Sequence, residues 1–132
     1  MMRRVSVLFL LLMSACLWRS YEQILAIHLD VLTQTANKLG DVAASSQGPA
    51  LGMAEYAYPA KRARQFLQQF SKHNGRSSYA GLKAFLDRYE RMLAEVDAAR
   101  LGEQIDGTRL RTEITALNEA ATTIRAQAAA AD

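Results

Sequence analysis

The sequence predicts an all-α protein: an up-down-up-down four-helix bundle that follows a cleaved N-terminal signal. Apolar residues recur at spacings of three and four along four segments of the chain, which is the pattern of amphipathic helices. Turn-forming residues separate these segments, and no stretch shows the alternation of a half-buried strand. Connections of about two to eight residues between helices favour antiparallel neighbours in a bundle.

The first 15 residues have the organisation of an export signal. Arg3 and Arg4 supply positive charge, Val5–Met13 is largely apolar, and the small residues Ser14 and Ala15 precede the cysteine. The uncharged run is shorter than the roughly 20 residues that a membrane-spanning helix needs. We therefore expect a segment that is processed rather than one that spans the bilayer.

The stretch Leu12-Met13-Ser14-Ala15-Cys16 resembles the lipobox of bacterial lipoproteins, with Met13 at a position where Leu is more usual. The resemblance covers residues 1–16. It implies that diacylglycerol is attached to the Cys16 thiol and that the peptide is cut just before it. Because Leu17 rather than Asp follows the cysteine, it also implies the outer membrane. An ordinary secretory signal and an uncleaved short anchor are the alternatives.

The chain of 132 residues is long enough for one domain. We divide it into a signal peptide at residues 1–15, a tether at 16–19, a four-helix bundle at 20–125 and an Ala-rich C-terminal tail at 126–132. The tail has little apolar bulk, so we expect it to fray.

The first two helices are expected at residues 20–44 and 51–73. In the first, Thr33 and Gln34 lie opposite an apolar arc that is formed by Tyr21, Ile24, Leu25, Leu29, Val31, Leu32, Ala36, Leu39, Val42 and Ala43. In the second, Pro59 either begins the helix or kinks it, because proline lacks an amide donor. The apolar arc of this helix consists of Tyr56, Ala60, Ala63, Phe66, Leu67 and Phe70.

The third and fourth helices have regular seams. Ser77 or Ser78 can cap the third, which runs to about Leu101, and the fourth starts near Thr108. The third seam consists of Leu82, Leu86, Tyr89, Leu93 and Val96, and the fourth of Leu110, Ile114, Leu117, Ala121, Ile124 and Ala128. Seams with this spacing suit packing at shallow angles.

The charge balance argues against a nucleic-acid-binding protein, and the cysteine content excludes an internal disulfide. The chain has 16 Lys and Arg against 13 Asp and Glu, and loss of Arg3 and Arg4 with the signal leaves the bundle nearly neutral. This balance argues against a nucleic-acid partner. The single cysteine cannot form an internal disulfide.

His28 falls within the apolar arc of the first helix, one turn from Leu25 and Leu32. A buried imidazole needs a hydrogen-bond partner. One reading is therefore a haem or metal ligand inside the bundle. The other, which we favour, is a core histidine that bonds a nearby polar group, so we expect no cofactor and no metal.

The second helix carries the candidate contact residues. Tyr56 and Tyr58 form an aromatic cluster, which could anchor a protein partner or cap the core. Lys61 and Arg62 add positive charge that could meet an acidic partner or lipid headgroups, and a solvated face is the alternative.

No nucleophile, acid pair or phosphate loop of an enzyme is recognisable. We expect a non-enzymatic envelope lipoprotein: a membrane-tethered binding or scaffold module, or an accessory subunit of an envelope protein complex. Its partners would be the membrane, through the lipid on Cys16, and another envelope protein, and a homo-oligomer is possible. A cofactor-binding bundle that uses His28 is the alternative, and a periplasmic chaperone is a third reading.

Overall fold

The computed structural model describes residues 20–43, 52–101 and 105–130. Over these ranges the chain forms a short 3-10 helix, η2 (Ser71–His73), and four α-helices with no strand; these are α2 (Tyr21–Ala43), α3 (Met53–Gln69), α4 (Ser77–Leu101) and α5 (Gly107–Ala129). The prediction of an all-helical chain with four helices is confirmed for these residues. The signal peptide, the tether and Cys16 lie outside them.

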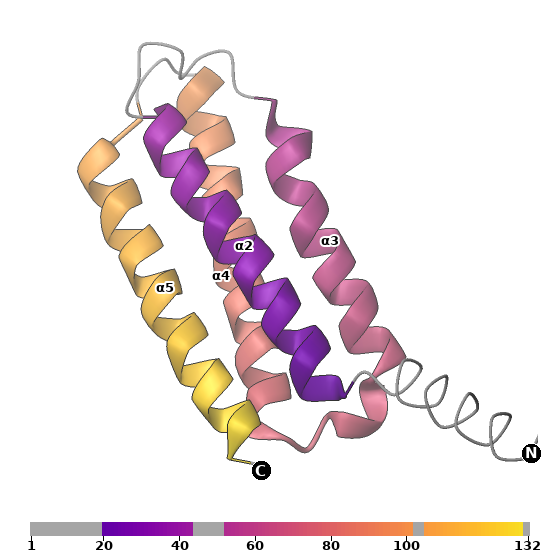
Figure 1. Cartoon of the computed structure of the whole chain (residues 1–132). Coiled ribbons are helices and arrows are strands. Elements are labelled where there is room, and N and C mark those ends of the chain that lie inside the picture. The colour runs from indigo at the N-terminus through magenta and orange to yellow at the C-terminus, as the bar shows by residue number, and fades with distance from the viewer. Residues whose placement is uncertain (1–19, 44–51, 102–104, 131–132) are drawn as a thin grey trace, which may run out of the picture.

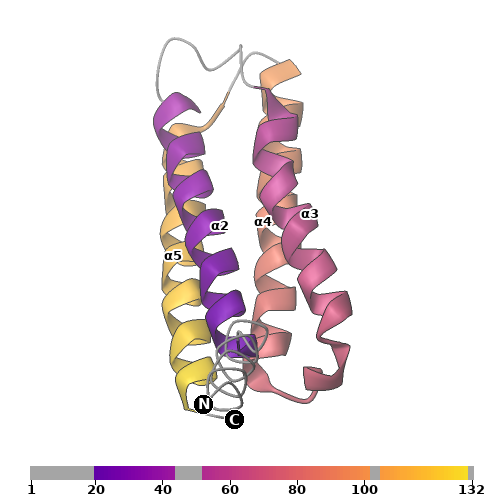
Figure 2. The same ribbon diagram turned by 45° about the vertical axis from the view of Figure 1, so that its right-hand side comes forward.

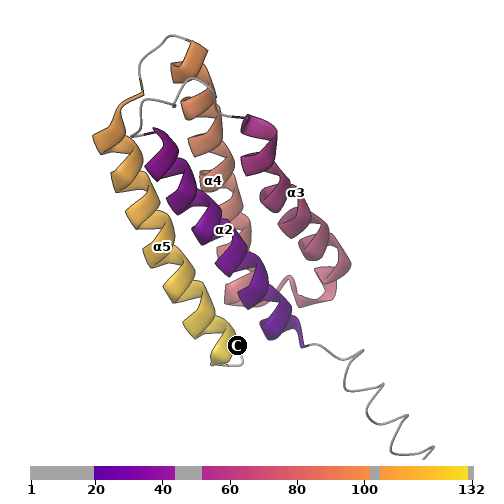
Figure 3. The same ribbon diagram turned by 45° about the horizontal axis from the view of Figure 1, so that its top comes forward.

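The four helices lie alongside one another as a bundle (Figure 1). Each helix has two main neighbours: α2 and α4 both pack against α3 and α5, an arrangement that can be followed in two further views (Figures 2 and 3). None of the described helices is long and apolar enough to cross a membrane.

Polar contacts link the ends of helices that follow one another in the chain. Lys38 near the end of α2 donates to Glu55 near the start of α3, at 2.8 Å. In the same way, Arg109 near the start of α5 donates to Glu95 near the end of α4, at 3.2 Å. Each contact therefore joins the end of one helix to the start of the next.

The helix boundaries follow from local chemistry. The carboxylate of Asp106 accepts a hydrogen bond from the Arg109 amide, at 3.1 Å, and so caps the start of α5. Pro59 lies inside α3 rather than at its start, within a helix that begins at Met53. At the other end α3 stops at Gln69, earlier than expected, and the chain continues through η2 to Asn74.

The core is built from apolar side chains of all four helices. Both predicted seams of α4 and α5 are buried throughout. The largest side chains that are fully buried are Tyr89, Leu25, Leu29, Leu32, Leu39, Leu82, Leu86 and Leu117. Burial of such side chains contributes roughly 1.5–3 kcal/mol each, and it is the main source of stability in a bundle of this kind.

The buried side of α2 is turned relative to the predicted arc. Val31 is 44% exposed, whereas Thr33, which we placed on the polar side, is buried. The Thr33 hydroxyl donates to the Leu29 carbonyl at 2.9 Å, so its burial leaves no unpaired donor. A polar residue can therefore occupy the covered side while an apolar one is left outside.

The packed part of the chain extends beyond residue 125, where we expected the bundle to end. Helix α5 continues to Ala129, and Ala128 belongs to the buried core. Because alanine is small, a residue of an Ala-rich stretch can be covered where the helices lie close together. Residues 131 and 132 of the predicted tail lie outside the described ranges.

Candidate functional site

Three large apolar side chains are exposed among the described residues. Ile27 and Val31 on α2 are 46% and 44% exposed, and Tyr58 on α3 is 60% exposed. Single exposed apolar residues are common, but a group that shares one surface indicates a contact site. The question is therefore whether these three side chains lie together.

The register between α2 and α3 brings these three side chains to one side of the bundle. Ile27 and Val31 precede Lys38 by eleven and seven residues, so the three lie along one stripe of α2. Tyr58 and Arg62 follow Glu55 by three and seven residues, so these also form a stripe, on α3. Since Lys38 bonds Glu55 directly, the two stripes face each other across the seam between the helices.

A second pair of contacts supports this register. The rings of His28 and Phe66 lie 5.1 Å apart, centre to centre; His28 comes ten residues before Lys38, and Phe66 comes eleven residues after Glu55. Arg62 lies one turn before Phe66, and its positive charge is close enough to lower the pKa of His28. By this register, Ile27, Val31, Tyr58 and Arg62 lie on the same outer side of α2 and α3, and we call this surface the α2–α3 face.

The α2–α3 face combines side chains that suit a protein contact. The Arg62 guanidinium lies 6.0 Å from the centre of the Tyr58 ring, within the range of a cation–π interaction. Tyrosine and arginine are enriched among the residues that contribute most to binding at protein interfaces. Ile27 and Val31 provide apolar area beside them.

The four predicted contact residues on α3 do not all lie at the surface. Tyr58, Lys61 and Arg62 are exposed, but Tyr56 is 3% exposed and belongs to the core. Its carbonyl oxygen accepts a hydrogen bond from the Tyr89 hydroxyl at 2.6 Å. Of the two readings for the tyrosine pair, Tyr56 therefore fits the core and only Tyr58 fits a contact.

His28 lies at the boundary between α2 and α3, partly buried, rather than in the centre of the bundle. Burial and then the charge of Arg62 lower its pKa, which favours the neutral imidazole near neutral pH. Across the described ranges, no group of three or more His, Cys, Asp or Glu side chains could hold a metal ion. The His28 ring packs against the ring of Phe66.

An aromatic cluster that the sequence did not predict joins three segments near Ser20. Tyr21 of α2 stacks on Phe66 and on His73, with ring centres 5.7 and 4.5 Å apart. Its hydroxyl lies 3.0 Å from the Ser78 hydroxyl at the start of α4. The Arg76 guanidinium lies 4.9 Å from the centre of the same ring. These contacts fix the first turn of α2 against α3, η2 and α4.

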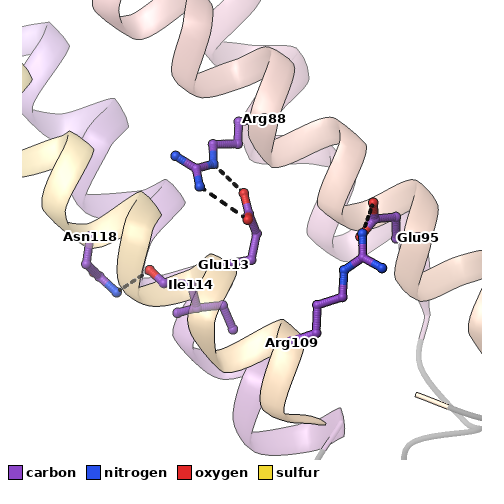
Figure 4. Close-up of polar contacts among 6 residues, drawn as sticks. All are labelled: Arg88, Glu95, Arg109, Glu113, Ile114 and Asn118. Carbon is purple, nitrogen blue, oxygen red and sulfur yellow. Dashed lines mark hydrogen bonds and ion pairs between the residues drawn. The ribbon is translucent and has the colours of Figure 1, made fainter. Parts of the chain in front are cut away.

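A groove with a volume of about 800 Å³ runs between α4 and α5. Its ion pairs connect the two helices: the Arg88 guanidinium bonds the carboxylate of Glu113, and Arg109 bonds Glu95 (Figure 4). On the next turns of α5, the side chain of Asn118 donates to the Ile114 carbonyl at 3.0 Å (Figure 4). Met92, Val96 and Leu110 are buried beneath the groove. Because four of its charged groups are paired with each other, the groove offers less to a charged ligand than the α2–α3 face.

The sequence contained a signal for the α2–α3 face that we did not use. Ile27 falls outside the predicted apolar arc of α2, so the sequence already places a large apolar residue on the side of this helix that faces away from the core. The groove between α4 and α5 had no comparable signal, because it depends on how two helices pack.

Comparisons with known protein families, with curated proteins and with solved structures found no match for this chain.

Proposed function

We propose that the protein is a bacterial envelope lipoprotein whose up-down-up-down bundle acts as a binding or scaffold module, or as an accessory subunit of an envelope protein complex. In this proposal the signal at residues 1–15 is removed and Cys16 carries acyl chains. The bundle is then held at the periplasmic face of a membrane, with the outer membrane favoured. The bundle binds a partner protein and holds it at that membrane, without catalysis.

The observation that carries the binding role is the α2–α3 face. The large apolar side chains with the greatest exposure in the described part of the chain, Ile27, Val31 and Tyr58, all belong to it. Leaving such groups in water gives up roughly 25 cal/mol for each Å² of apolar area. A partner that covers the face would recover that free energy, and Arg62 would give the contact an orientation.

The lipobox pattern supports the membrane tether. Two or more acyl chains give stable attachment, at about 0.8 kcal/mol per buried CH₂ group. A tether of residues 16–19 spans at most about 14 Å even when fully extended. A lipid on Cys16 would therefore keep the start of α2 at Tyr21 close to the membrane surface.

The tether is tested by the intact mass of the protein from the membrane fraction of a bacterial host. We expect a chain that begins at Cys16 and carries the additional mass of acyl chains, and we expect the Cys16→Ser variant to lack that mass and to leave the membrane fraction. A chain that retains Met1, or one cut elsewhere without lipid, would rule out the lipoprotein proposal.

The binding role is tested by photo-crosslinking in living cells. A photoreactive amino acid is placed at Val31 or Tyr58 on the α2–α3 face, and at Arg111, an exposed residue of α5, as the control. We expect the two face positions to crosslink one and the same protein and the Arg111 position not to do so. Crosslinks of equal yield from all three positions, or from none of them, would refute the assignment of the face.

A further inference from the structure

The charge of the α2–α3 face narrows the chemistry of its partner. Helix α3 contains a single acidic residue, Glu55, which is already paired with Lys38. Of its basic residues, Arg64 pairs with carboxylates of α4. No carboxylate of the described residues pairs with Lys61 or Arg62, and both side chains are exposed. The face therefore presents one available cation, Arg62, next to its apolar side chains, and Lys61 is the residue before it.

We propose that the α2–α3 face binds an acidic amphipathic helix of the partner protein. This inference rests on the proposed binding role and names the chemistry of the partner. The helix would lie along the seam between α2 and α3, with its apolar residues on Ile27, Val31 and Tyr58. Amphipathic helices bind through apolar residues spaced by three and four, and Ile27 and Val31 lie four residues apart along α2.

Arg62 is placed to receive a carboxylate of such a helix. Its guanidinium is planar and can donate two parallel hydrogen bonds to one carboxylate. The contact with the Tyr58 ring restrains it, so less side-chain freedom is lost when a ligand binds. Lys61, the adjacent residue, adds a second cation with a more flexible side chain.

The same charge would also attract an anionic membrane, but the partial burial of the apolar side chains favours a helix. About half of Ile27 and of Val31 is already covered by neighbouring residues. Side chains that insert into a bilayer penetrate roughly 5–10 Å below the headgroups. Half-covered side chains in a seam between two helices instead suit the protruding side chains of a third helix.

The experiment uses the mature acylated protein in nanodiscs of phosphatidylcholine, a zwitterionic lipid with no net charge. The probe is a fluorescent peptide of about 18 residues, long enough to form a helix, with leucines at spacings of three and four and with glutamate and alanine at the remaining positions. Matched peptides carry glutamine or lysine in place of glutamate. We expect the glutamate peptide to bind at least about tenfold more tightly than the glutamine peptide, and we expect added salt to reduce this advantage. Equal affinity for the glutamate and lysine peptides would overturn the proposal.

Variants locate the contact on the protein. Arg62→Glu and Tyr58→Ala are each expected to weaken binding of the glutamate peptide by about tenfold, with unchanged helicity by circular dichroism. Arg111→Glu makes the same charge change on α5, outside the α2–α3 face, and is expected to keep the affinity of the native chain. An equal loss in Arg111→Glu would mean that only net charge matters, and would overturn the proposal.

A separate experiment tests whether the α2–α3 face binds an anionic membrane instead. The Cys16→Ser variant, which lacks the lipid, is mixed with vesicles of phosphatidylglycerol and floated on a density gradient. We expect no flotation that depends on Arg62. Flotation that Arg62→Glu abolishes would assign the face to anionic lipid and overturn the proposal. If crosslinks through Tyr58 identify a protein but the glutamate peptide does not bind, then the binding role stands and the acidic helix is rejected.

Discussion

Tyr89 is the largest fully buried side chain of the described core, and its hydroxyl donates to the Tyr56 carbonyl oxygen at 2.6 Å. Burial raises the pKa of this phenol well above its ordinary range, so the group stays neutral and able to donate. We predict that Tyr89→Phe lowers the free energy of unfolding by about 1 kcal/mol, the net value of a buried hydrogen bond. Urea unfolding measures the change.

Tyr79 provides the control for this substitution. Its hydroxyl donates to the Leu67 carbonyl, also at 2.6 Å, but the bond is only partly buried. Tyr79→Phe should therefore cost less than Tyr89→Phe, because water can take the place of the lost hydroxyl. Equal costs for the two variants would contradict the view that burial decides the value of the bond.

Protonation of His28 should weaken the fold in mildly acidic solution. Burial and the charge of Arg62 lower its pKa below the ordinary value of about 6.5. The unfolded chain then takes up the proton first as the pH falls, so the free energy of unfolding is unaffected above about pH 6.5 and declines below it. We predict that His28→Asn makes this decline shallower. The measurement is urea unfolding at successive pH values between about 7 and 5.

His73 contributes in the same direction, because burial and then the charges of Arg76 and Lys72 lower its pKa. His73→Asn should therefore reduce the remaining slope, and the double variant should be the flattest of the series. A His28→Asn variant with the slope of the native chain would show that the half-buried site does not disfavour the charged imidazole.

At the scale of the helices, two glycines allow close approach to α5. A methyl group at Gly81 of α4 would lie 2.9 Å from the Cγ1 atom of Ile124, and one at Gly40 of α2 would lie 2.7 Å from the Cδ1 atom of Ile114. The Cδ1 atom is the free end of a side chain and can move, whereas Cγ1 sits next to a branched carbon with few rotamers.

We predict different outcomes for alanine at these two glycines. Alanine favours a helix over glycine by about 1 kcal/mol, which should offset the movement of Ile114, so Gly40→Ala should be close to neutral. Gly81→Ala should be destabilising, because overpacking costs about 1–3 kcal/mol and exceeds that gain. Thermal unfolding of both variants provides the comparison. A Gly81→Ala variant as stable as the native chain would show that α4 and α5 can separate freely.

The spacing of apolar residues was enough to predict the helices and most of their buried sides. The predicted seams of α4 (from Leu82 to Val96) and of α5 (from Leu110 to Ala128) are buried, as the spacing of their apolar residues indicates. Periodicity does not show how far round a helix its neighbours reach, so Val31 and Thr33 were placed on the wrong sides of α2. The α2–α3 face was half predicted: Tyr58 and Arg62 were identified, but the inclusion of Ile27 and Val31 depends on the register with α3. That register is a tertiary property.

At the scale of the whole molecule, ion pairs link every pair of neighbouring helices. Lys38 and Glu55 join α2 to α3, and Arg64 joins α3 to two carboxylates of α4. Arg88 and Arg109 bind carboxylates across α4 and α5, while Arg125 binds Asp30 across α5 and α2. Exposed pairs contribute only about 0–1 kcal/mol each. Their larger effect is to disfavour packing arrangements that would bring like charges together.

A charge exchange between α3 and α4 tests this role. Arg64 bonds both Asp87 and Glu90, so Arg64→Glu would place three carboxylates together, and we predict a loss of about 1 kcal/mol in the free energy of unfolding at low salt. Adding Glu90→Arg restores an attractive pair and should recover more than half of that loss. Both effects should shrink in about 1 M NaCl, where the Debye length is about 3 Å.

The charge exchange needs a control variant that changes the net charge without breaking an ion pair. Arg111→Glu on α5 supplies it: the side chain is exposed and lies outside the pairs that link the helices, so its cost should stay within about 0.5 kcal/mol. If Arg64→Glu costs no more than Arg111→Glu, then the charges do not select the neighbours of α3. The position of α3 would then depend on Tyr56, Phe66 and the other buried side chains alone, and the α2–α3 face would keep its shape at any salt concentration.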